Sequence, residues 1–151
     1  MITYWQQEDG RLVKKDSDEI NPDMNIWIDA RSVTREDIRI LEEEFNVQQE
    51  HILDILDPDE LSRIEKDDEY TLTIARIPVF VPSDDISYFT APLGIIVYPH
   101  TIITICWTDC EVLKDMTANR MKGLSLADFP AFIVKILSRA DTLFLRYLKE
   151  I

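Results

Sequence analysis

Residues 86–108 contain no Asp, Glu, Lys or Arg, and the structure of this uncharged stretch decides which class of fold the sequence can adopt. The stretch is long enough for a membrane helix, which needs about 20 consecutive apolar residues. It is interrupted, however, by two prolines and a glycine, and many of its residues are β-branched, which favours strands. We therefore predict two strands, at 88–98 and 101–107, joined by a hairpin connection at Pro99 and His100.

Further strand signals precede this stretch, and together they predict a mixed α/β fold. They cover residues 2–6, 11–14, 25–29 and 70–79. The runs at 70–79 and 93–106 are largely apolar on both faces, which is typical of strands that helices cover on both sides. We expect a mixed β-sheet with helices on both faces, which is an α/β/α arrangement.

Three cap signals predict where helices begin. In each, a polar residue that accepts a hydrogen bond from the first turn is followed three positions later by an acidic residue. The cap residues are Thr34, Asp57 and Thr108. They predict helices from about 35, 58 and 109, and the third places Cys110 in the first helical turn. A further short helix is predicted over 47–56.

The C-terminal segment carries an apolar stripe at helical spacing. From Ser125, apolar residues recur every three or four positions, and no glycine, asparagine or proline stop signal follows Pro130. We predict an α/β domain over 1–124 and a helical segment over 125–151 that packs on it and is truncated before the helix ends. The stripe needs a partner, either the rest of this domain or a neighbouring helix of a missing portion.

Most of the negative charge lies in one block of the sequence. The chain carries a formal charge of −13, and residues 36–69 contribute −11 of it, with fourteen acidic and three basic side chains. Nucleic-acid binding is disfavoured, because neutralising phosphates requires clustered cations. Two interpretations of the block stay open: a solvated acidic face that keeps the protein in solution, or a surface that attracts cations.

The sequence lacks the motifs of common catalytic sites. It has two histidines, no glycine-rich phosphate loop and no nucleophile motif, so we predict that the protein is not an enzyme. His100, Cys106 and Cys110 are three conceivable zinc ligands, but the spacing of the cysteines is atypical and Cys106 lies in an apolar strand. Core thiols and a turn histidine are the favoured interpretation.

Asp54, in the helix predicted over 47–56, is expected on the side of the helix that faces away from the core. At 100° per residue, Ile52 and Ile55 share one side of this helix, and Asp54 falls opposite them, nearer Glu50 and His51. We therefore expect Asp54 to point away from the core.

The same region resembles a known family. The residues concerned are His51, Asp54-Ile55-Leu56, Arg63-Ile64-Glu65, and Tyr70 with the apolar strand after it. Together with Trp27-Ile28-Asp29 and the hairpin at 92–107, they resemble the cytoplasmic N-terminal domain of CorA-type magnesium/cobalt transporters. The similarity spans most of the chain and is most specific over 50–77. One departure is Glu60-Leu61-Ser62-Arg63, which stands where the family has Gln-Arg-Pro-Lys.

This resemblance implies a function in ion transport. It implies an α/β/α cytoplasmic domain, then a helical stalk and two membrane helices, a homopentamer, and a Gly-Met-Asn pore signature; the stalk, the membrane helices and the signature are not in this sequence. It also implies that Asp54 belongs to a regulatory divalent-cation site whose partner carboxylate comes from a neighbouring subunit. Mg²⁺ is then both regulatory and transported, Co²⁺ is a further cargo, and the full-length protein lies in the cell membrane with this domain on the cytoplasmic side.

Two alternatives stay open. One is a zinc-transporting relative of the same superfamily. The other is a soluble α/β protein-interaction domain without a transport role, which binds a partner helix through the stripe of Phe132, Leu143 and Phe144.

Overall fold

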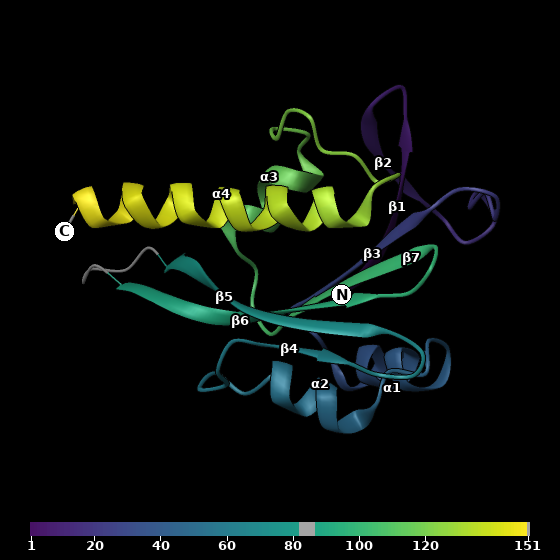
Figure 1. Ribbon diagram of the computed structural model, residues 1–151, viewed down its shortest axis with the longest axis horizontal. Helices are drawn as coiled ribbons and strands as arrows, with labels where there is room; N and C mark the ends of the chain where they lie inside the picture. Colours follow the sequence, from purple (N-terminus) through teal and green to yellow (C-terminus); the bar gives the residue numbers. More distant parts are fainter. Residues whose placement is uncertain (82–86, 151) are drawn as a thin grey trace.

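The computed structural model describes residues 1–81 and 87–150, and these form one seven-stranded mixed sheet with four helices (Figure 1). The strands are β1 (Ile2–Glu8), β2 (Arg11–Lys15), β3 (Ile26–Arg31), β4 (Arg63–Lys66), β5 (Thr71–Val81), β6 (Ser87–Val97) and β7 (Thr101–Cys106). The helices are α1 (Arg35–Glu43), α2 (Gln49–Ile55), α3 (Glu111–Thr117) and α4 (Phe129–Glu150). The predicted mixed α/β class is confirmed.

The sheet consists of two antiparallel groups that one parallel pair joins. Its strand order is β2-β1-β3-β7-β6-β5-β4. Within each group the neighbours run antiparallel. β3 and β7 run parallel, so that residues 26–31 lie beside residues 101–106.

The uncharged stretch forms strands, as predicted. β6 and β7 are antiparallel neighbours, with the connection at residues 98–100 between them. Residue 86, where the stretch begins, lies outside the described residues. Among the residues that are described, no helix combines the length and the apolar character needed to cross a membrane.

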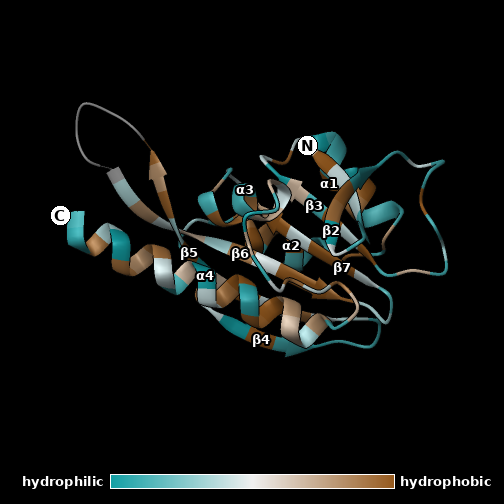
Figure 2. Cartoon of the chain, turned by 90° about the horizontal axis from the view of Figure 1, so that it is seen from above, coloured by the Kyte–Doolittle hydropathy of each residue, from teal (hydrophilic) through white to brown (hydrophobic). Residues whose placement is uncertain are grey.

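Helices lie on the two sides of the sheet, α3 and α4 on one and α1 and α2 on the other (Figure 1). A hydrophobic core lies on each face of the sheet, and successive residues of β3 point into different cores. Trp27 packs with residues of α3 and α4, whereas Ile28 and Ala30 pack with residues of α1 and α2. Figure 2 shows the central strands largely in brown and the long connections mostly in teal. Burial on two faces explains why the central strands are apolar throughout.

Helix α1 begins at the cap that the sequence predicts. Thr34 Oγ1 accepts a hydrogen bond from the Asp37 backbone N–H at 3.2 Å, and Asp37 Oδ2 accepts one from the Thr34 N–H at 2.9 Å. This reciprocal pair satisfies two N–H groups that have no partner inside the helix. Helix α2 likewise lies within the range predicted for it.

The helix predicted from residue 58 is wrong. The Glu60 N–H donates to the Asp57 carbonyl at 3.0 Å in a turn, and the chain then enters β4. Leu61 and Ile64 are the large aliphatic side chains of residues 58–66, and they are 74% and 77% exposed, so no packed apolar face stabilises a helix here. Pairing with β5 supplies the backbone hydrogen bonds instead.

Helix α3 begins two residues later than predicted. Its N-cap is Cys110, which is extended, so Cys110 precedes the helix instead of lying in its first turn. Thr108 does not cap it, because its hydroxyl donates to the Asp109 carbonyl at 3.2 Å. Asp109 Oδ1 accepts from the Cys110 N–H at 2.9 Å, so a side chain outside the predicted cap pattern holds this end.

The apolar stripe of α4 packs against the rest of the domain. Phe132 and Leu143 are fully buried, and Phe144 is half-buried. Phe132 and Leu143 are therefore not free to bind a partner helix, which was the surface expected for an interaction domain, whereas Phe144 lines an apolar pocket with Tyr147 and Leu148. Ile151, the last residue of the predicted helical segment, lies outside the described residues.

Helix α2 approaches the sheet closely at Gly94 of β6. A Cβ atom on this glycine would lie 2.3 Å from Cδ1 and 2.6 Å from Cγ1 of Ile55, so a larger residue does not fit without movement. Ile52 and Ile55 are fully buried against the sheet. The contact fixes how deep α2 sits on its face of the sheet.

Candidate functional site

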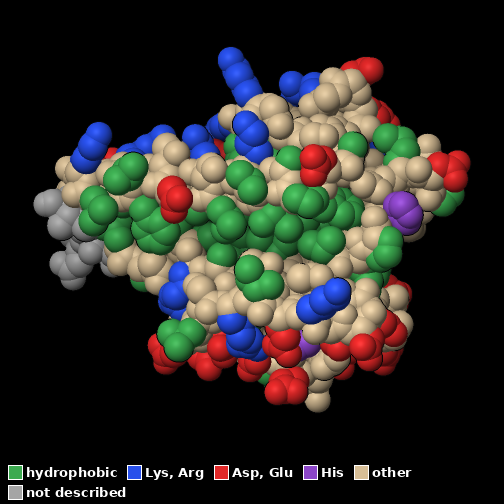
Figure 3. Space-filling view, viewed as in Figure 1, with side chains coloured by type: hydrophobic (Ala, Val, Ile, Leu, Met, Phe, Trp, Pro, Cys, Tyr) green, Lys and Arg blue, Asp and Glu red, His purple; other side chains and the backbone are tan. Residues whose placement is uncertain are grey.

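The negative charge of the sequence gathers on one face of the folded chain. The block 36–69 forms α1, α2 and β4. Figure 3 shows Asp and Glu side chains along the lower edge of the molecule, over these elements, and Lys and Arg side chains along the opposite, upper edge. Acidic side chains thus predominate on this face, with some Lys and Arg side chains among them, and it is the candidate site for a cation.

Asp54 lies on this face, in an ion-pair cluster centred on Arg63. Arg63 Nη2 donates to Asp54 Oδ2 at 2.7 Å, and Nη1 donates to Glu60 Oε1 at 2.7 Å. Arg63 Nε lies 3.3 Å from Glu65 Oε2. The hydrogen bond to Asp54 raises the pKa of Arg63 above its ordinary value. One guanidinium therefore neutralises part of the charge of three carboxylates.

The fold around Asp54 explains this geometry. Burial of Ile52 and Ile55 turns the Asp54 side chain outward, and its side chain is 32% exposed. Arg63 opens β4, whose pairing with Ile74 of β5 places it beside α2. Asp54 Oδ2 is held by Arg63, and Oδ1 has no hydrogen-bond partner within residues 1–81 and 87–150. Among the described residues, one oxygen of Asp54 thus has no protein partner.

His51 does not lie on the polar side of α2 where the sequence placed it. It is buried, and its Nδ1 lies 2.5 Å from the hydroxyl of Tyr70. That hydroxyl also accepts the Gln48 N–H at 3.1 Å. Nε2 faces Glu65 Oε1 at 3.5 Å. Both ring nitrogens are engaged, so His51 is a structural residue of the α2 core.

The three conceivable zinc ligands are not brought together. His100 lies in the turn before β7 and its Nδ1 is 3.2 Å from Asn25 Oδ1, whereas Cys106 ends the same strand. Cys106 and Cys110 are both buried, and the hydrogen bond between them, together with burial, raises the pKa of Cys110 well above its ordinary value. These thiols belong to the core, which agrees with the favoured interpretation of the sequence.

One group of acidic side chains in the described part of the chain is spaced like metal ligands. It consists of Asp16, Asp18 and Glu19. All three are exposed and lie in the loop between β2 and β3, away from α2. Exposed acidic groups of this kind are common without a metal, and this one is separate from Asp54.

An ion cluster beneath α3, in which Asp29 is buried and Asp109 is partly exposed, was not predicted from the sequence. Arg31 donates to Asp29 Oδ2 through Nε at 2.9 Å and Nη2 at 2.6 Å, and Arg31 Nη1 donates to Asp109 Oδ1 at 2.7 Å. Asp29 is 2% exposed, and its Oδ1 has no hydrogen-bond partner among the described residues. Burial raises the pKa of Asp29 above its ordinary value. The cluster ties β3 to the start of α3.

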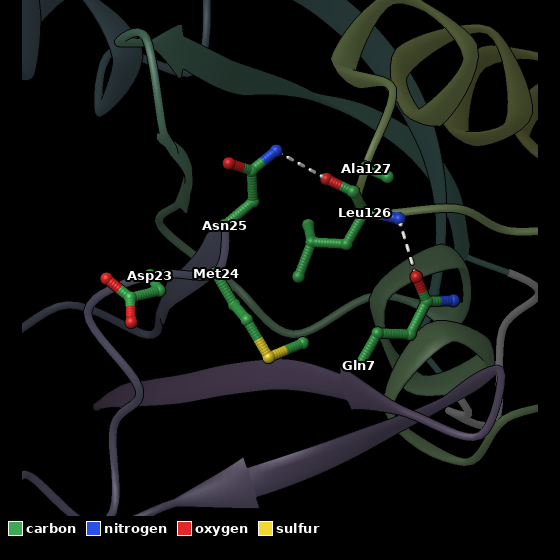
Figure 4. A pocket seen from close by; sticks show the side chains of 6 residues that line it. All are labelled: Gln7, Asp23, Met24, Asn25, Leu126 and Ala127. Atoms are coloured by element: carbon green, nitrogen blue, oxygen red, sulfur yellow. Dashed lines mark hydrogen bonds between the residues drawn. The ribbon is translucent and has the colours of Figure 1, made fainter.

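A cavity of about 290 Å³ lies near the start of α4 (Figure 4). Asn25 Nδ2 donates to the Leu126 carbonyl at 3.0 Å, and Gln7 Oε1 accepts from the Leu126 N–H at 2.8 Å. Figure 4 shows both amides directed at the backbone of this loop. Their polar atoms hold the segment before α4 in place, so these two amides have a structural role.

Residues 23–151 match the model of a family described as CorA-like Mg²⁺ transporter protein. A search of curated proteins gave no significant match. The complete CorA magnesium transporter of Methanocaldococcus jannaschii is similar with a TM-score of 0.76 and 19% identity, over 99% of this chain and 48% of that chain. The soluble domain of the same CorA is similar with a TM-score of 0.70 and 24% identity, over 99% of this chain and 60% of that chain.

A third similar structure is the ZntB cytoplasmic domain of Vibrio parahaemolyticus. Its TM-score is 0.68 and its identity 16%, over 98% of this chain and 62% of that chain. At these identities the structures establish the fold alone. The chain spans about half of the complete CorA and about three fifths of the two separate domains. The family description is that of a transporter, which agrees with the prediction that the chain is not an enzyme.

Proposed function

The chain belongs to the CorA-like Mg²⁺ transporter family, and we propose that it is the regulatory, divalent-cation-sensing domain of a transporter for Mg²⁺ and Co²⁺. The family match over residues 23–151 is the observation that carries this proposal. It is supported by the acidic face formed by α1, α2 and β4, because such a face raises the local concentration of cations.

In this proposal Asp54 is the sensing residue. Its donor atom is a carboxylate oxygen, the ligand type that Mg²⁺ prefers. Asp54 Oδ1 is the oxygen available for this role, because Arg63 holds Oδ2. Within one chain the neighbouring carboxylates converge on Arg63 and not on a common ion position. The site therefore needs a second carboxylate from a neighbouring subunit, and the bound ion keeps several waters and binds weakly.

A cation at this position acts by holding two subunits together. Negative faces of adjacent subunits repel each other, and an ion bridging Asp54 to a carboxylate of the next subunit offsets that repulsion. When the Mg²⁺ concentration falls, the ion leaves and the subunits are free to move. The full-length protein is then a homopentamer in the cell membrane, with membrane segments outside this chain and this domain on the cytoplasmic side.

Zn²⁺ is the second candidate for the transported ion, and the similarity to the ZntB domain supports this alternative. The side chains on the acidic face favour Mg²⁺, because they are hard oxygen donors. Zn²⁺ sites usually contain histidine or cysteine. His51 and both cysteines are buried and engaged in the core, so they do not complete a zinc site on this face.

The test uses the full-length transporter with Asp54→Ala. Mg²⁺ protects the closed arrangement of subunits from proteolysis, and we expect this protection to require a higher Mg²⁺ concentration in the variant. Asp59→Ala is the matched control, because Asp59 is an exposed carboxylate on the same face with no side-chain hydrogen bond within the described residues. Unchanged protection in Asp54→Ala refutes the sensing role.

A second test separates the transporter from other uses of the fold. Translation of the gene beyond Ile151 is expected to give two apolar segments of about 20 residues and a Gly-Met-Asn signature. A stop codon directly after Ile151 contradicts the transporter proposal.

A further inference from the structure

Basic side chains gather on the face opposite to the acidic one. Figure 3 shows them along the upper edge, over α4 and the connection that leads to it. Four of them surround one hollow of about 210 Å³, which hydroxyl groups also line. The cations are Arg120, Lys122, Lys135 and Arg139.

Two walls of different origin form this hollow. Lys135, Ser138, Arg139 and Thr142 follow one another at spacings of three, one and three residues, which places them on one face of α4. The connection from α3 to α4 forms the other wall. It turns at Gly123, whose φ is +74°, and Lys135 Nζ lies 3.3 Å from where a Cβ on this glycine would be. The Lys135 side chain therefore extends from α4 to the connection.

The positive charge of the hollow is only partly neutralised. Asp115 Oδ2 accepts from Arg139 Nε at 2.8 Å and from Arg139 Nη2 at 2.5 Å. Asp115 Oδ1 lies 3.8 Å from Arg120 Nη1. Lys122 and Lys135 form no ion pair within residues 1–81 and 87–150. The buried carboxylate of Asp115 thus offsets the charge of the two arginines only in part, and the charge of the two lysines remains.

These groups suit an anion with several oxygens and more than one charge. Asp115 fixes the Arg139 guanidinium in place, so Arg139 loses little conformational freedom when it binds. Its Nη1 is not used by Asp115, and the two lysines supply mobile point charges. Thr142 donates its hydroxyl proton to the Ser138 carbonyl at 3.1 Å, whereas the Ser138 hydroxyl makes no hydrogen bond among the described residues.

We propose that the hollow between α4 and the α3–α4 connection binds a phosphate group, with Lys122 and Lys135 as its charge partners and Arg139 as its fixed donor. A phosphate monoester carries close to two negative charges and three acceptor oxygens, which matches several cations at once. The phosphate belongs either to a small soluble phosphate compound or to an anionic lipid headgroup. This site is separate from Asp54 and does not depend on the proposed cation sensing.

The experiment measures binding by the 151-residue chain at constant ionic strength. One arm titrates pyrophosphate by calorimetry, and the other measures sedimentation with vesicles of phosphatidylcholine, with or without phosphatidic acid. We expect saturable binding in at least one arm, and a loss of affinity of about tenfold for each of Lys122→Gln and Lys135→Gln, as for hydrogen bonds to charged groups. Binding of pyrophosphate identifies a soluble compound, and binding to phosphatidic acid vesicles alone identifies a lipid headgroup.

The control is Lys149→Gln, which removes a lysine of the same helix that does not line the hollow. Its affinity should equal that of the unchanged chain. The proposal is overturned if neither probe binds, or if Lys149→Gln weakens binding as much as Lys135→Gln does. Equal circular dichroism spectra and melting temperatures of the variants show that a loss of binding is not a loss of fold.

Discussion

Replacing Gly94 by alanine tests whether α2 is seated on the sheet by contact with Ile55. The added Cβ would meet Ile55 Cδ1 at 2.3 Å, Cγ1 at 2.6 Å and Cγ2 at 3.0 Å. Two of these distances are below 3.0 Å, so the Ile55 side chain or the backbone must shift to admit the methyl group. Overpacking of this kind costs about 1–3 kcal/mol. Alanine in a strand gains about 0.5–1 kcal/mol over glycine, so we expect Gly94→Ala to lower the free energy of unfolding by up to about 2.5 kcal/mol.

A double-mutant cycle separates the clash from other effects of the substitution. Ile55→Ala alone costs about 2–5 kcal/mol, because it leaves a cavity at a fully buried position. In that background the methyl group that Gly94→Ala adds occupies part of the cavity, so the substitution should be neutral or stabilising. Ile52→Ala is the matched control, since the three atoms nearest to the added Cβ all belong to Ile55. There Gly94→Ala should keep most of its cost.

The assay is urea unfolding followed by tryptophan fluorescence, with the midpoint and slope measured for each variant. Trp27 is fully buried and reports on the sheet. An equal cost of Gly94→Ala in the unchanged chain and in the Ile55→Ala background would falsify the reasoning, and so would a stabilising effect in the unchanged chain.

Two further predictions concern charged groups. Arg63→Gln frees Asp54 from its intramolecular partner, so in the full-length transporter the Mg²⁺ concentration for half-maximal protection from proteolysis should fall about two- to fivefold, as expected for a partly exposed ion pair. Arg63→Lys, which keeps the charge, should change it less, and an unchanged or higher midpoint in Arg63→Gln contradicts the competition. Burial raises the pKa of Asp29 above its ordinary value of 3.8, so the native state binds this proton more tightly than the unfolded state does. The free energy of unfolding therefore falls as the pH rises through the raised pKa of Asp29. Urea unfolding between pH 4 and pH 7 should therefore show Asp29→Asn gaining stability relative to the unchanged chain as pH rises, and a difference independent of pH refutes this.

The sequence predicted local features better than contacts between distant segments. The cap at Thr34 is local, because both of its hydrogen bonds join residues three positions apart. The helix expected from residue 58 had a similar cap signal, but its apolar residues Leu61 and Ile64 stay exposed, and β5 offered a strand partner. A cap signal therefore predicts a helix only where an apolar stripe follows it.

Part of the candidate site was accessible to sequence reasoning. The outward direction of Asp54 follows from the burial of Ile52 and Ile55 on the same helix. Arg63 was not recognised as its partner, because β4 was not expected and the pairing depends on that strand. The position of His51 was predictable in principle, since it lies four residues before Ile55 and therefore on the same face of α2.

The ion cluster of Asp29, Arg31 and Asp109 could not be predicted from the sequence, for a different reason. Asp29 and Arg31 lie on β3, whereas Asp109 follows β7, and only the parallel pairing of these two strands brings them together. No spacing in the sequence records which strands become neighbours. Charged residues at the end of an apolar strand, such as Arg31, are the signal that could have pointed to a buried ion pair.

The parallel pair β3–β7 has a consequence for the order in which the chain folds. It is the strand pairing that joins the three N-terminal strands to the other four, and it links residues 26–31 to residues 101–106. Closing so long a loop is slow, and proteins rich in such distant pairings fold slowly. During synthesis, the first three strands expose one edge of β3 until residue 106 has left the ribosome. The N-terminal part of the domain is therefore most prone to aggregate during this interval, before the edge of β3 is paired.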